Sequence, residues 1–227
     1  MSEASRRFTT IDLPEGWQVR TRDGFDDLFD FDPSVLGVDR DFLAALEVDI
    51  TPTLNAAVHY GLVMLAAFVE SIDPAPVELD VSDLEVPFSA DEIEPVAIAA
   101  TVALLQQGRP PGGPPELREA LGAAAGRWLA DHEEAELPVG PAIITREVMS
   151  VHPPTLKQAS DVMVVTYYLF PEADPGSMLV AMFRTPSLGF ASEFDLLFAS
   201  MASTIELVEL DAEDAALLAA GPPPSEP

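Results

Sequence analysis

The sequence predicts an α+β fold, an α/β/α sandwich in which a mainly antiparallel sheet is covered by helices. The strands come from residues 137–151, 162–170 and 178–185, three consecutive segments with strand-like patterns. The covering helices come from residues 51–69 and 192–205, which carry apolar side chains at helical spacing. The chain of 227 residues, 48% of them apolar, is long enough to build one sizeable core.

The N-terminal half is predicted to add two strands and two helices. Residues 8–13 and 77–88 alternate apolar and polar side chains, which is typical of half-buried strands. Residues 51–69 begin with a Thr-Pro pair suited to the start of a helix. Apolar side chains then occupy nearly every face, as in a central buried helix. Residues 91–107 are also predicted to be helical, with a proline in the first turn.

The C-terminal half is predicted from its turn residues and its caps. Residues 108–115, with the sequence GRPPGGPP, form a linker before a helix at 116–130. Residues 171–177, PEADPGS, have the length and composition of a hairpin turn between two strands. Ser192 followed by Asp195 fits a capping box at the start of the last helix.

Domain organisation follows from composition. Residues 1–209 are predicted to form a single globular domain, and residues 210–227 an acidic, proline-rich tail that is partly disordered. No apolar run reaches the roughly 18 to 20 residues that a membrane-spanning helix requires. The first ten residues lack the apolar stretch of a secretory signal, and the chain has no cysteine, so we expect a cytoplasmic protein.

The net charge of the chain limits the classes of partner that we expect. The chain has 11 Lys and Arg against 39 Asp and Glu, for a net charge of −28, and Lys157 is its only lysine. Binding to nucleic acid or to an anionic membrane needs clustered cations, which this sequence lacks, so we expect neither. The partner that we expect is another protein, and its charge would favour a basic one. The sequence leaves the oligomeric state open.

Candidate chemistry centres on three scattered histidines. His59 lies four residues after Asn55 in the predicted buried helix, so the two would share a face. They could line a pocket in which the imidazole carries a proton, or His59 could be a core residue satisfied by a hydrogen bond. His132, within DHEEAE, matches no helix-borne metal motif and is interpreted as part of a solvated helix end. No catalytic or metal-binding residue is assigned, and no cofactor is expected.

The segment from residue 137 to residue 207 also resembles a known fold. Its strand after LPVGPAIITRE, its strand ending TYYLFP, its turn ADPGS and its final MLVAMFRTPSLGFASEFDLLFASMASTIEL resemble a PsbP-like α/β/α sandwich. The resemblance is to uncharacterised actinobacterial proteins of that shape. It implies docking or accessory roles more than catalysis, and these motifs contain no catalytic signature.

Three functional hypotheses follow. The first is a non-enzymatic protein-interaction or accessory protein, in an unidentified pathway, steered to its partner by negative charge. The second is a small-molecule binding or catalytic pocket around His59 and Asn55. The third is an acidic inhibitor or immunity protein that neutralises a basic partner.

Overall fold

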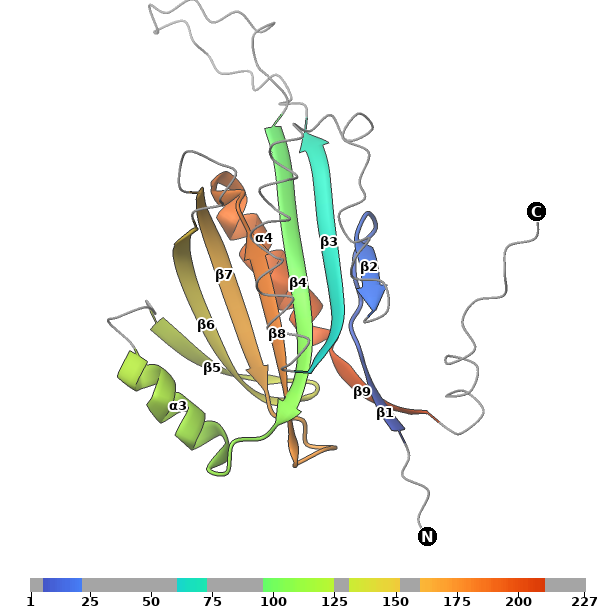
Figure 1. Ribbon diagram of the computed structural model, residues 1–227, viewed down its shortest axis with the longest axis vertical. Helices are drawn as coiled ribbons and strands as arrows, with labels where there is room; N and C mark the ends of the chain where they lie inside the picture. The colour runs from blue at the N-terminus through green and yellow to red at the C-terminus, as the bar shows by residue number, and fades with distance from the viewer. Residues whose placement is uncertain (1–5, 22–60, 73–95, 125–130, 152–159, 211–227) are drawn as a thin grey trace, which may run out of the picture.

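The computed structural model describes residues 6–21, 61–72, 96–124, 131–151 and 160–210 (Figure 1). Most of them form one seven-stranded antiparallel sheet, whose strand order is β2-β3-β4-β8-β7-β6-β5. The strands of this sheet are β2 (Gln18–Thr21), β3 (Leu62–Ile72), β4 (Val96–Gly108), β5 (Asp131–Leu137), β6 (Gly140–Val151), β7 (Ser160–Leu169) and β8 (Ser177–Thr185). A second, two-stranded sheet pairs β1 (Arg6–Thr10) with β9 (Glu206–Leu210).

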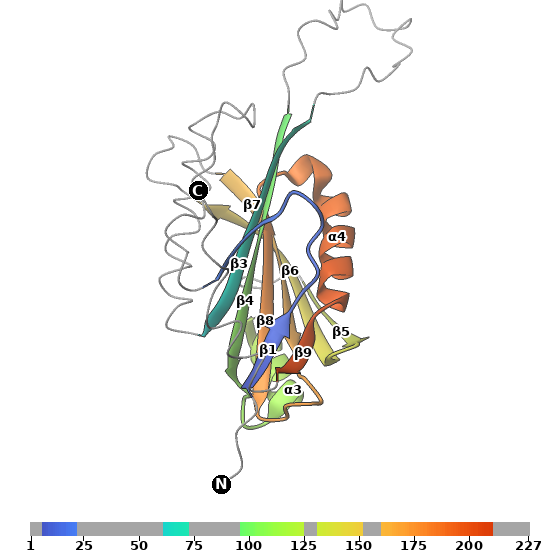
Figure 2. The same ribbon diagram turned by 90° about the vertical axis from the view of Figure 1, so that its right-hand side faces the viewer.

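Helices cover the sheet only in part, and the predicted α/β/α sandwich is therefore wrong. The described residues contain two α-helices, α3 (Gly113–Ala124) and α4 (Ala191–Ser203), and a short 3-10 turn, η3 (Leu188–Phe190). Figure 2 shows α4 running along one face of the sheet, whereas α3 lies near one end. The antiparallel character of the sheet was predicted correctly. The prediction of two helical layers covering the sheet was wrong.

The error came from β3 and β4, which the sequence predicted as parts of the helices at 51–69 and 91–107. Neighbouring residues of these strands are buried on opposite faces of the sheet, so almost every position is apolar. Leu65 and Ala66 on β3 are both buried, and so is the β4 run from 98 to 105. A strand buried on both faces shows continuous rather than alternating hydrophobicity, and this pattern resembles that of a buried helix. Alanine favours helix in isolation, so the strand conformation of alanine-rich β4 shows that tertiary packing overrides local helix propensity.

The C-terminal strands were predicted more accurately. β7 and β8 pair in register from Met163↔Thr185 to Leu169↔Leu179, which confirms the hairpin. Asp174 holds its turn, because the backbone N–H of Ser177 donates to the Asp174 carbonyl and the Ser177 hydroxyl donates to the carboxylate. The segment 137–151 is not one extended run, since a turn at residues 138 and 139 separates β5 from β6.

Helix α4 forms the main core with the sheet. Its predicted apolar stripe is confirmed, because Phe194, Phe198 and Met201 are buried and Leu197 packs partly against the same core. The Phe198 ring stacks on Phe183 of β8 with centroids 4.9 Å apart. The predicted cap is wrong. Phe190, rather than Ser192, occupies the N-cap position and makes no side-chain capping bond.

Helix α3 packs on the opposite face. It confirms residues 116–124 of the helix predicted at 116–130, while residues 125–130 lie outside the described residues. The helix begins at Gly113, inside the predicted linker. Pro114 and Pro115 fit there because the first turn of a helix leaves its N–H groups without partners. Leu117 and Leu121 pack against a second cluster of buried residues, which includes Ile143 of β6.

Two predicted segments lie outside the described residues. They are the strand predicted at 77–88 and the tail from 211 onward. No helix in the described ranges is long and apolar enough to cross a membrane.

The packing of α4 predicts a large contrast between two nearby residues. Phe198→Ala removes a fully buried ring and should lower the free energy of unfolding by about 3–5 kcal/mol. Leu196→Ala is the matched control, since this side chain is 75% exposed, and its effect should stay within about 0.5 kcal/mol. Urea denaturation of both variants measures the difference. Equal losses would contradict the placement of α4.

Two glycines should respond to alanine with opposite signs. Gly140 has φ +139°, and a Cβ there would lie 2.4 Å from the Phe170 carbonyl oxygen, so Gly140→Ala should cost more than about 1 kcal/mol. Gly122 lies within α3 with open space around it, so Gly122→Ala should stabilise by about 0.5–1 kcal/mol. Thermal unfolding of the two variants tests this; a neutral Gly140→Ala would contradict the turn geometry.

Candidate functional site

The residues singled out from the sequence are not brought together in the described structure. Asn55 and His59 lie outside the described residues, and the helix predicted to carry them is a strand from Leu62 onward. His132 lies on β5, so its assignment to a helix end is wrong.

A crevice instead lies between the first turns of α3 and the β5–β6 hairpin. Its volume is about 280 Å³. The lining side chains are apolar where β6 and the α3 prolines meet, and charged along β5 and α3. They are Pro114, Pro115, Arg118, Glu134, Ala135, Glu136, Pro141, Ala142 and Ile143.

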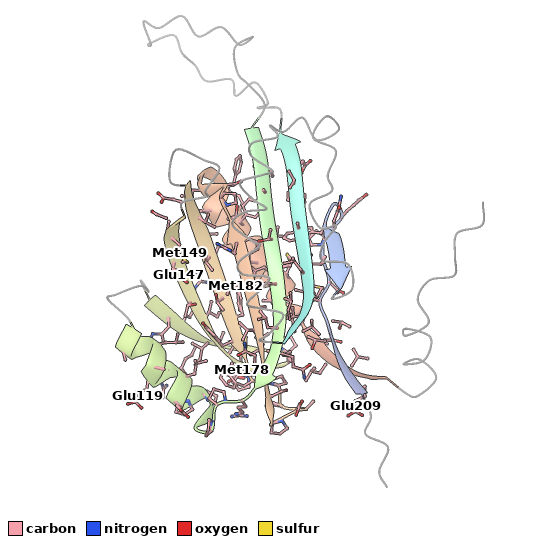
Figure 3. The ribbon with its side chains drawn as sticks, viewed as in Figure 1. Glu119, Glu147, Met149, Met178, Met182 and Glu209 are labelled. Atoms are coloured by element: carbon pink, nitrogen blue, oxygen red, sulfur yellow. The ribbon has the colours of Figure 1, made fainter. Side chains whose placement is uncertain are left out.

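An ion pair joins the two walls of this crevice. Arg118 of α3 donates to a carboxylate oxygen of Glu134 on β5, with Nη1 and Oε1 2.5 Å apart. Both side chains are about half exposed, so solvent screening limits what the pair adds to stability. Its geometric effect is to fix the position of α3 over β5. Figure 3 shows Glu119 on the same helix.

The hairpin geometry positions the β5 side of the crevice. The two-residue turn closes on the pair Leu137↔Gly140, and β5 and β6 stay in register to Asp131↔Arg146. Two hydrogen bonds anchor the tip of the hairpin, from the Phe170 N–H to the Pro141 carbonyl and from the Glu172 N–H to the Val139 carbonyl. The crevice wall is therefore attached to the end of β7.

A charged network lies on the opposite face of the same hairpin. Arg146 of β6 donates to Asp195 of α4 and to Glu133 of β5, each at 2.9 Å. Burial opposes its charge, but these two hydrogen bonds raise the pKa of Arg146. Asp195 therefore tethers α4 to the sheet; it does not serve the helix cap that was predicted for it. The network links a helix and two strands, which is a structural role.

Tyr167 of β7 lies close to this network. The side chain is buried, and its hydroxyl has no hydrogen-bond partner among the described residues. Burial, reinforced by the charge of Asp195, raises the pKa of Tyr167 to about 12. Its ring packs edge-on against Phe183, with centroids 5.6 Å apart. The neutral hydroxyl is thus part of the core.

A further charged pair lies on the α3 face of the sheet. Glu147 of β6 and Arg184 of β8 share one cross-strand row, with Val164 between them. Figure 3 shows Glu147 and Met149 along β6. Burial raises the pKa of Glu147, and the positive charge of Arg184 partly offsets this rise.

The crevice combines an apolar lining with charged side chains from α3 and β5. Within the described ranges, no three His, Asp or Glu side chains gather as a metal site. Sequence reasoning missed the crevice because β5 was assigned to a helix end. A signal was present, since PVG follows a segment in which Glu133, Ala135 and Leu137 alternate with His132, Glu134 and Glu136.

The buried hydroxyl of Tyr167 makes stability depend on pH. The folded pKa of about 12 lies above the unfolded value of about 10, so the neutral form stabilises the fold fully below pH 10. This contribution, roughly 2 kcal/mol, should be lost as pH rises from 10 to 12.

The control is Tyr167→Phe, which removes the titrating hydroxyl. Between pH 10 and pH 12 this variant should not show the loss of roughly 2 kcal/mol in stability that is due to Tyr167. At pH 7 the variant should be equally stable, or more stable by up to about 1 kcal/mol, because no hydrogen bond is broken. Chemical denaturation at a series of pH values measures both effects. A loss above about 2 kcal/mol at pH 7 would show that the hydroxyl is paired.

Comparison with known proteins does not extend this description. No protein-family model matches the chain, and neither does any curated protein sequence. The resemblance to PsbP-like proteins therefore stays a prediction.

Proposed function

We propose that this chain is a non-enzymatic interaction protein that binds a basic surface of another protein. The supporting observation is how its arginines are used. Each arginine whose side chain the structure describes is engaged within the chain itself. Arg109 lies over the Phe170 ring at 5.3 Å, Arg118 pairs with Glu134, Arg146 pairs with Glu133 and Asp195, and Arg184 faces Glu147 across one strand.

The carboxylates, in contrast, greatly outnumber these cations, and most of those whose side chains the structure describes are exposed. The chain has 39 acidic residues against 11 basic ones. Glu119 on α3 and Glu209 on β9 are both exposed and lie at opposite sides of the molecule (Figure 3). The negative field is therefore broad. Such a field accelerates encounter with a positively charged partner and repels an acidic one.

A non-enzymatic role is supported by what the inner polar groups do. Arg146 and Asp195 attach α4 to the sheet. Thr185 donates to the Ala99 carbonyl and accepts from the Ser187 N–H, which secures the end of β8. These groups are committed to holding elements together, which leaves the outer carboxylates for recognition.

The test is capture of partners by the full-length chain from a lysate of the source organism. We expect at least one specific partner with a basic surface, and its affinity should fall at least about tenfold when salt is raised well above physiological strength. The control bait is an unrelated protein of equal net charge. If the control captures the same proteins, or if the partner binds independently of salt, the proposal is wrong.

A further inference from the structure

β5 forms one end of the seven-stranded sheet (Figure 1). Its inner side pairs with β6 over all seven residues, while no described strand pairs with its outer side. The other edge strand, β2, has only four residues. An edge strand presents unpaired N–H and C=O groups that can pair with a strand from another chain.

The register identifies which β5 backbone groups point away from β6. A two-residue turn closes on a hydrogen-bonded pair, here Leu137↔Gly140, and hydrogen-bonded pairs alternate with non-bonded ones along an antiparallel ladder. Glu133 and Ala135 therefore direct their backbone groups toward β6. Glu134 and Glu136 direct theirs outward, away from the sheet.

The side chains of the same two residues line the crevice next to α3. Glu134 and Glu136 face it from β5, together with the Arg118 guanidinium. Glu116 and Glu119 are also exposed on α3. This end of the molecule therefore presents four glutamates against two arginines, Arg118 and Arg109, the latter beside Gly113 at the start of α3. The floor of the crevice, by which we mean its apolar lining, is formed by Pro114, Pro115 and Ile143. A segment that pairs with β5 would run beside these carboxylates and over this floor.

A second copy of this chain is a poor occupant. Antiparallel pairing of two β5 strands would bring the glutamates of one copy against those of the other, and like charges across a strand pair destabilise it. We therefore propose that β5 accepts an extended segment of a partner protein as an added strand, with Lys or Arg at alternate positions facing Glu134 and Glu136. This inference rests on the proposed function, and it specifies the residue types that the partner's binding segment should contain.

The probe for the test is a short peptide that alternates lysine and valine, matched in length to β5. Fluorescence anisotropy should show saturable binding to the full chain, and a glutamate–valine peptide should not bind. Two further versions of the lysine peptide are N-methylated on alternate residues, one on the odd and one on the even positions. Both keep the charge, but only one of them loses the N–H groups that would pair with β5, and that version should bind at least about tenfold more weakly than the other.

The matched variants separate backbone pairing from charge. Glu136→Pro removes one outward N–H and should weaken peptide binding at least about tenfold. Glu136→Gln removes only the charge and should weaken it severalfold, while Glu206→Gln, on exposed β9, should have no effect. Circular dichroism establishes whether the proline variant folds; if it does not, the methylated peptides decide. Hydrogen exchange of the unaltered chain should show Glu134 and Glu136 amides protected by the peptide.

Three results would overturn the inference: no binding of the lysine peptide, equal binding in both methylation registers, or unchanged exchange at Glu134 and Glu136. None of these disproves the proposed function, which is judged by capture of a basic partner. If a captured partner binds the folded Glu136→Pro chain as tightly as the unaltered chain, the function stands and the site is wrong.

Discussion

Burial of β4 and β8 on both faces is the constraint on which the rest of the structure depends. Leu104 and Phe183 face α4, whereas Ala103 and Val180 face the side on which α3 packs. Because these strands lie at the centre, both faces of the sheet must be apolar, and each helix must present a matching stripe. The stacked rings of Phe183 and Phe198 meet this condition on the α4 side. The ion pairs of Arg118 and Arg146 then fix elements that apolar contact has already brought together.

This constraint also explains how much of the fold the sequence could predict. Helix α4 was predicted well because its one buried face gives apolar side chains at helical spacing. Strands β7 and β8 are buried on both faces, but turn residues bound them, and this made them recognisable. Strands β3 and β4, which are also buried on both faces, were predicted wrongly. In β3 and β4 the apolar positions are too continuous for either period to be read, and alanine favours helix in isolation. What decides between helix and strand there is the pairing of β4 with β3 and β8, which no local pattern records.

The candidate site was harder to predict, for a related reason. The sequence drew attention to His59 and Asn55 as residue types suited to chemistry, whereas the crevice is made of prolines, alanines and glutamates. Its character comes from the way α3 and β5 lie beside each other, with the Arg118–Glu134 ion pair between them, and local sequence patterns do not record this arrangement. Charge, in contrast, was readable from composition alone. A favoured class of partner could therefore be inferred without knowing the surface that would bind it.

The pairing of β1 with β9 has a consequence for how the protein is made. The two ends of the described chain meet in this small sheet, and nearby the Asp12 N–H donates to the Thr204 hydroxyl across 192 residues of sequence. At ordinary synthesis speeds the first of these segments waits on the order of ten to forty seconds for the second to be synthesised. During that time β1 has no partner strand, and an unpaired strand can associate with other chains. Completion of the fold is thus coupled to the synthesis of β9, so a product truncated before Glu206 would expose an unpaired β1.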